Sequence, residues 1–195
     1  MKKIIILIFV LVINTFTHAE EWDVKRDAKN SVKFTSSTTV LDFDGVTDKI
    51  DGYIYWEGDK IFSGKNELYF EVDLNTVKTG ISKRDRDMRE DVLETDKWPK
   101  TYFKGIIISA SKTDSSNSYN IIAKGKMFIH GIEKEMKIPA IIKIQNGTMN
   151  VQTRFSAFLK DYNIEAPSLL AFIKVAEEIK LSLNFYLQKS AEKNN

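Results

Sequence analysis

The densest group of side chains that could do chemistry lies near the middle of the chain. Residues Lys83–Asp91 hold four basic and four acidic side chains. Such a run could bind nucleic acid through its cations, or supply carboxylates for acid–base catalysis. Here each basic residue has an acidic neighbour, so the run carries no excess positive charge for a phosphate backbone. No pair of carboxylates stands out from the other charges. We therefore expect neither nucleic-acid binding nor catalysis from this run.

The same run has the spacing of a short helix. Opposite charges four residues apart stabilise helices, and they occur here as Lys83/Asp87, Asp85/Arg89 and Arg86/Glu90. Ser82 followed by Asp85 also has the spacing of a helix capping box. Met88 and Val92, again four apart, give the helix one apolar edge. We predict a short amphipathic helix near residues 82–94, inserted between strands.

Other candidate nucleophiles and metal ligands are few. The sequence has no cysteine, and its only histidine beyond the first 19 residues is His130. This excludes a thiol nucleophile and a zinc site made of several histidines. His130 precedes Gly131 where a strand ends, so we expect a surface residue in a turn, without a chemical role. Phosphate-binding and dinucleotide-binding glycine motifs are absent from the sequence. We predict no enzyme, no catalytic residue and no metal site.

The N-terminal residues have the pattern of a secretory signal peptide. Two lysines precede the apolar run Ile4–Ile13, and Thr17-His18-Ala19 ends the leader with small residues around the expected cut. The apolar run is too short for a membrane span, which needs about 20 residues. We predict cleavage near Ala19, export to the periplasm, with secretion as the alternative, and no membrane span after cleavage.

The rest of the chain has the size of one domain. We assign residues 20–190 to it and residues 191–195 to a polar tail. Without the two leader lysines, basic and acidic residues are equal in number, which again disfavours nucleic acid as a partner.

Apolar and polar residues alternate over most of this domain, as they do in half-buried strands. The clearest alternating segments are residues 50–56, 67–74, 119–129, 136–144, 148–155 and 179–188. Asn146-Gly147 predicts a two-residue hairpin turn, and Gly125 predicts a bulge or a close approach of two strands. Many short strands with short turns indicate an all-β antiparallel barrel or sandwich. With 12 Phe, 7 Tyr and 3 Trp, a barrel would either be filled by side chains or enclose a ligand cavity.

The order of these motifs resembles the YceI-like family of bacterial periplasmic proteins, from Trp22 to about Leu187. The family pattern T-x-x-x-x-R-D-x-H-L, followed by W-P and a phenylalanine, is matched by Thr79, Arg84-Asp85, Trp98-Pro99 and Phe103. Three other segments resemble the opening strand, a hairpin and the D-Y/F-G-I loop of the family: Trp22–Phe34, Ala123–Ile132 and Phe158–Ile164.

The chain departs from the family pattern at three positions. Asn30 and Asp87 stand where the family usually has histidines, and Asn163 stands where it has glycine. We therefore do not expect any role that needs those histidines. We still expect the fold of the family, because it does not depend on them.

The resemblance implies an eight-stranded, lipocalin-like antiparallel β-barrel that holds a long apolar or amphiphilic lipid, such as a polyisoprenoid or a quinone tail. A bound isoprenoid lipid or quinone is then the only cofactor-like molecule expected. Candidate wall positions on the strands are Phe34, Ile54, Phe70, Phe103, Phe128, Phe155 and Phe185. Plain core packing is an equal alternative for each of them.

The resemblance also gives the charged helix a place at one end of the barrel. Met88 and Val92 would then face the cavity, and Arg84 and Asp85 would form a structural pair that fixes the helix to the barrel. A secreted interaction domain with a filled core and no lipid remains the alternative function. An outer-membrane barrel is disfavoured by the polar C-terminal sequence QKSAEKNN. The oligomeric state is left open, a homodimer included.

Cleavage after Ala19 predicts a mature chain that begins at Glu20. N-terminal sequencing of the protein purified from the cell envelope checks this. An intact Met1 in the mature pool would contradict export by this route.

Overall fold

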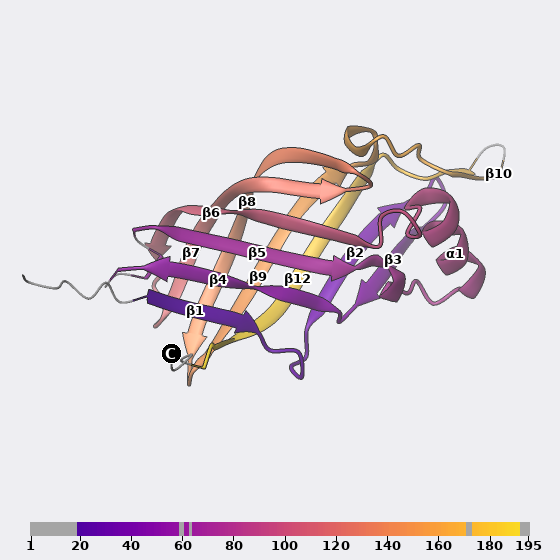
Figure 1. Cartoon of the computed structure of the whole chain (residues 1–195). Coiled ribbons are helices and arrows are strands. Elements are labelled where there is room, and N and C mark those ends of the chain that lie inside the picture. The colour runs from indigo at the N-terminus through magenta and orange to yellow at the C-terminus, as the bar shows by residue number, and fades with distance from the viewer. Residues whose placement is uncertain (1–18, 59–60, 63, 171–172, 192–195) are drawn as a thin grey trace, which may run out of the picture.

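One antiparallel sheet dominates the computed structural model, which describes residues 19–58, 61–62, 64–170 and 173–191 (Figure 1). Its strands are β1 (Ala19–Val24), β2 (Ser31–Ser37), β3 (Asp42–Thr47), β4 (Ile50–Glu57), β5 (Asn66–Asp73), β6 (Lys100–Lys112), β7 (Ser118–Ile129), β8 (Ile132–Gln145), β9 (Thr148–Phe158) and β12 (Glu178–Lys189). A small hairpin, β10 (Ser168–Leu170) and β11 (Ile173–Lys174), lies outside this sheet. The predicted signal peptide and polar tail lie almost entirely outside the described residues.

The sheet closes on itself. Its strand order is β1-β4-β5-β6-β7-β8-β9-β12-β2-β3, and β1 pairs in addition with β12. The strands β1, β4 to β9 and β12 therefore form a ring in which each strand pairs with its neighbours on both sides. Closure removes free edges within the ring, where they would invite pairing with other chains, whereas β3 at the end of the strand order keeps an outer edge. The predicted eight-stranded antiparallel barrel is confirmed.

The second edge of β12 is shared by two strands. β1 pairs with its last residues, Leu187–Lys189, and β2 pairs with its earlier residues, Lys180–Asn184. β3 continues outward from β2 and meets the chain after β5, where Val46 and Lys78 exchange two backbone hydrogen bonds of 2.9 Å. The hairpin of β2 and β3 thus fills the gap that β1 leaves at one end of the barrel.

The two ends of the barrel differ in how they are filled. At the end that carries β1 and the β8–β9 turn, large buried side chains pack the interior: Trp22, Trp56, Phe62, Met149 and Leu187. We call this the plugged end. The opposite end, which we call the mouth, carries the β2–β3 turn, the helical insert and the segment that contains β10 and β11 (Figure 1).

The helical insert connects β5 to β6. It consists of η1 (Leu74–Thr76), α1 (Ser82–Asp87) and a turn of π-helix, η2 (Met88–Val92), so the helix predicted near residues 82–94 is confirmed. The predicted capping box does not form, because Ile81 is the residue before α1 and no side chain caps it. Among the described residues, no helix is long and apolar enough to cross a bilayer.

Two local predictions about the strands hold. Asn146 and Gly147 both have positive φ, 52° and 70°, as the tight β8–β9 turn requires. Gly125 lies opposite Gly105 in the β6–β7 pair, and a Cβ added to Gly125 would lie 2.2 Å from the carbonyl oxygen of Lys104. Gly125 therefore marks a close approach of two strands, while the register shift in this pair lies at Ile107–Ser109.

A row of aromatic rings crosses the outer surface of β4 to β7. Tyr53, Tyr69, Tyr102 and Phe128 follow one another with centroid separations of 6.3, 5.7 and 4.7 Å, and Trp98 packs on Phe128 at 6.0 Å. The prediction that Phe128 lies in the cavity wall is therefore wrong. In β7 the alternation points its neighbour Met127 inward, and Met127 is buried.

Gly125→Ala is expected to destabilise the barrel by about 3 kcal/mol, because its methyl group meets the backbone of β6, which cannot move without loss of strand pairing. Gly147→Ala is the matched control. Its Cβ has open space, so only the left-handed φ is strained, at about 1 kcal/mol. Urea unfolding measures both free energies, and equal losses would contradict the close approach.

Candidate functional site

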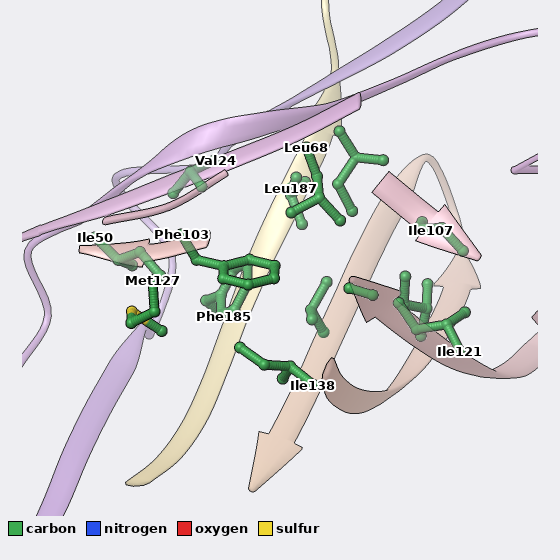
Figure 2. Close-up of a cluster of buried hydrophobic side chains, with 14 of the residues drawn as sticks. Val24, Ile50, Leu68, Phe103, Ile107, Ile121, Met127, Ile138, Phe185 and Leu187 are labelled. Carbon is green, nitrogen blue, oxygen red and sulfur yellow. The ribbon is translucent and has the colours of Figure 1, made fainter. Parts of the chain in front are cut away.

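An apolar cavity occupies the half of the barrel next to the mouth. Its volume is about 630 Å³, and its wall consists mainly of inward-facing side chains from the barrel strands and from the β2–β3 hairpin. Figure 2 shows side chains from several strands, Phe103 and Phe185 among them, pointing toward one another inside the barrel. Cavities that hold small molecules typically have volumes of about 300–1,000 Å³. The barrel is thus packed at one end and hollow at the other.

Most of the wall positions expected from the sequence face this cavity. Those that line it are Phe34, Ile54, Phe70, Phe103, Phe155 and Phe185. Phe70 and Phe185 meet edge to face across the interior, with ring centroids 4.8 Å apart. Contact of these residues with a ligand stays a prediction.

Aliphatic residues make up much of the wall and were not singled out from the sequence. They include Leu68, Ile121, Met127, Ile138 and Ile142, each at an inward position of its strand. The same alternation that indicated the strands could have found them, whereas a search for aromatic residues alone could not.

The helical insert contributes to the wall at the mouth. Met88 and Val92 are half-buried and line the cavity, and Val92 also packs against the core. Ile81 and Phe158 line it as well, although 54% and 42% of their surfaces are exposed. Since residues of the wall reach solvent here, the cavity opens at the mouth.

Arg84 and Asp85 do not form the direct pair that was expected. Consecutive residues in a helix point in different directions, and the two side chains bind Thr79 instead. Thr79 donates its backbone N–H, at 2.7 Å, and its hydroxyl to Asp85 Oδ1. Arg84 donates from Nε to the Thr79 hydroxyl and from Nη2 to the Thr79 carbonyl oxygen, both at 2.8 Å. The pair therefore fixes the helix to the preceding segment through a third residue.

The charge of Asp85 is stabilised in this arrangement. Burial by itself raises the pKa of its carboxyl, but the hydrogen bonds from Thr79 and the charges of Arg89 and Arg84 outweigh burial and lower the pKa below its usual value. The Arg84 guanidinium also lies over the ring of Phe43, 4.5 Å from its centroid. This cation–π contact joins the insert to β3.

Asp87 stands where the resemblance led us to expect a histidine. It forms an ion pair with Lys83, and both residues lie on the rim of the cavity. Arg84 is the third charged residue that lines the cavity.

His130 is not the free surface residue that the sequence suggested. Its side chain is 14% exposed, Nε2 lies 2.8 Å from Glu94 Oε2, and Nδ1 lies 3.2 Å from the carbonyl oxygen of Tyr162. Hydrogen bonds from Lys97 and, with a smaller effect, from His130 lower the pKa of the Glu94 carboxyl. His130 thus ties the end of the helical insert to the β7–β8 turn and to η3 (Leu159–Tyr162).

The two other departures from the family pattern have structural explanations. Asn30 is buried, donates to the carbonyl oxygen of Lys25 at 2.9 Å and accepts from the N–H of Tyr186 at 3.0 Å. Asn163 has φ 53° at the end of η3, a left-handed position that asparagine tolerates better than most residues other than glycine. Neither residue lines the cavity.

Metal binding has no support in the described part of the chain. Nowhere in it do three or more histidine or carboxylate side chains gather as a metal ion would require.

Comparison with known proteins identifies related chains. The sequence profile of the YceI-like domain matches residues 22–187. No protein with a curated description matches the chain significantly.

Solved structures share the fold at low sequence identity. BcnA of Burkholderia cenocepacia superposes with a TM-score of 0.67 at 16% identity, covering 84% of this chain and 99% of its own. A polyisoprenoid binding domain from Saccharophagus degradans, implicated in plant cell wall breakdown, gives 0.63 at 14% identity, with 88% and 98% covered. The YCEI protein of Campylobacter jejuni gives 0.55 at 15% identity, with 76% and 85% covered.

His130→Asn should lower the free energy of unfolding by about 1–3 kcal/mol, because it removes both hydrogen bonds of a largely buried ring. Asparagine suits the positive φ of this position, 51°, so backbone strain does not add to the effect. Glu94→Gln keeps an acceptor opposite the ring and should cost less. If His130→Asn unfolds like the wild type in urea, the histidine is dispensable after all.

Proposed function

The chain belongs to the YceI-like family, and we propose on that premise that it binds the apolar tail of a long lipid inside the barrel. A polyisoprenoid or a quinone with such a tail is the class of ligand we propose. The observation that supports this most is the apolar cavity of about 630 Å³ that opens at the mouth. The likeness of the fold to the polyisoprenoid binding domain from Saccharophagus degradans is consistent with it.

The mechanism we propose is burial without catalysis. Each CH₂ group that leaves water for the apolar wall gains about 0.8 kcal/mol, so a tail of several isoprene units supplies ample binding free energy. The wall offers aliphatic and aromatic contacts from strands on all sides of the cavity. A carrier or sequestering protein needs an apolar wall that contacts the tail and an opening through which the tail enters. The mouth supplies that opening. We propose the periplasm as the place of action.

Extraction of the full chain, purified from the cell envelope, tests this proposal. Organic solvent should release one isoprenoid-type lipid per chain, identified by mass spectrometry. A chain that carries no lipid, and takes none up from added prenol, would favour the interaction domain with no ligand.

The double variant Met88→Asp/Val92→Asp is expected to lose co-purified lipid and to keep its β-sheet circular dichroism. Two carboxylates at the mouth must be desolvated or hydrated within the apolar wall, and either outcome opposes entry of a tail. Ile106→Asp/Ile141→Asp is the matched control, since both residues are exposed and neither lines the cavity. Retention of lipid at wild-type stoichiometry by the first variant would show that the helical insert does not guard the cavity.

A further inference from the structure

Large apolar side chains extend from the mouth into solvent. Val40 and Leu41, in the turn between β2 and β3, are 67% and 54% exposed. Ile81, directly before α1, and Phe158, the last residue of β9, are exposed as well. Single exposed apolar residues are common on protein surfaces, but several at one end of a molecule mark a site of interaction.

The turn that carries Val40 and Leu41 is held by hydrogen bonds. The Thr38 hydroxyl accepts from the N–H groups of Val40, at 3.3 Å, and Leu41, at 3.1 Å. It also donates to the carbonyl oxygen of Leu41 at 2.9 Å, and the Thr38 N–H donates to the same oxygen at 2.8 Å. These bonds use only the backbone of Val40 and Leu41, so the exposed position of their side chains belongs to an ordered turn.

The exposed residues continue the apolar wall of the cavity. Ile81 and Phe158 line the cavity and reach solvent at the same time. Leu41 lies two positions before Phe43, which lines the cavity, and so shares its side of the hairpin. An apolar path therefore runs from the interior to the outer rim. A lipid tail that crossed water on its way out of a bilayer would lose its apolar surroundings, whereas a rim in contact with the bilayer would keep them.

The charges beside these residues indicate what kind of partner fits. The β2–β3 hairpin and the helical insert, residues 31–47 and 74–92, together hold six basic and six acidic side chains. Lys83 and Arg86 both lie beside Asp87, and Lys33 pairs with Asp44. An acidic protein or a strongly anionic membrane would be attracted by an excess of cations, which these segments lack. A lipid interface can bind exposed aliphatic side chains without such an excess.

We propose that the mouth docks on the surface of a lipid bilayer, with the side chains of Val40, Leu41 and Ile81 inserted below the head groups. This inference rests on the proposed function and adds the membrane as the partner from which a tail passes directly into the cavity. Because the contact is apolar and the adjoining charges balance, docking depends little on salt or on anionic lipid.

A fluorescent label on the turn tests the insertion. The sequence has no cysteine, so Val40→Cys can carry a single nitrobenzoxadiazole group, whose emission rises and shifts to the blue in apolar surroundings. Phosphatidylcholine vesicles should produce this shift, and added phosphatidylglycerol or salt should change it little. Ile141→Cys is the matched control, exposed on the outer wall and outside the cavity, and its label should not respond. No shift at position 40, or equal shifts at both positions, would overturn the inference.

An unlabelled variant tests the contribution of the turn to docking. Val40→Ser/Leu41→Gln keeps the backbone groups that bind Thr38, so it should fold like the wild type. Its affinity for phosphatidylcholine vesicles, measured by cosedimentation, should fall at least about tenfold, because two large aliphatic side chains no longer leave water. Ile106→Ser/Ile141→Gln is the matched control and should cosediment like the wild type. Wild-type affinity of the first variant, or an equal loss in the control, would overturn the inference.

Uptake of the C20 alcohol geranylgeraniol separates this inference from the proposed function. Val40 and Leu41 do not line the cavity, so Val40→Ser/Leu41→Gln should bind the dissolved alcohol as the wild type does. It should take the alcohol up from vesicles more slowly, as measured by mass spectrometry of the chain after the vesicles are removed. Equal uptake rates would overturn docking as the route of entry and leave lipid binding intact. A wild type that binds vesicles but no alcohol, dissolved or from vesicles, would contradict the proposed function instead.

Discussion

The edge of β12 that faces away from β9 is shared between β1 and β2, and the arrangement of the barrel depends on that division. Where β1 pairs with β12, the ring is closed and indole rings and aliphatic side chains pack its interior. Where β2 pairs with β12 in place of β1, the β2–β3 hairpin extends the barrel wall toward the insert after β5. The same continuous strand is thus part of a packed core at one end and of a hollow cavity at the other.

The polar interactions of the molecule follow this asymmetry. The segments at the mouth are irregular, and they are held by specific contacts rather than by strand pairing: the Thr79 contacts of Arg84 and Asp85, the Arg84–Phe43 contact, and the links of His130 to Glu94 and Tyr162. These contacts fix the helical insert beside the opening and leave the apolar edge of Met88 and Val92 toward the cavity. A stable mouth with an apolar lining can admit a tail without exposing the core.

Much of this arrangement could be predicted from local patterns, because strand alternation, the Asn146-Gly147 turn and charge pairs four apart are short-range signals. These patterns gave the insert and an antiparallel barrel or sandwich, whereas the eight-stranded barrel and the cavity wall were expected from the resemblance to the YceI-like family. Phe128 was placed on the wrong face of β7. Neighbouring residues of a strand point to opposite faces, so a shift of one position separates the cavity wall from the outer aromatic row. The contacts of His130 were not predicted, because its partners Glu94 and Tyr162 come from segments distant in sequence.

We propose that a lipid tail lies in the hollow half of the barrel. Methyl NMR of the chain with methyl 16-doxylstearate, a neutral lipid with a nitroxide near the tail end, tests it most directly. A tail inside the barrel should broaden the methyl signals of Ile54 and Ile142, deep in the wall, more strongly than those of Ile106 and Ile141 on the outer face. Broadening that is strongest on the outer face, or none at saturating lipid, would contradict a tail inside the barrel.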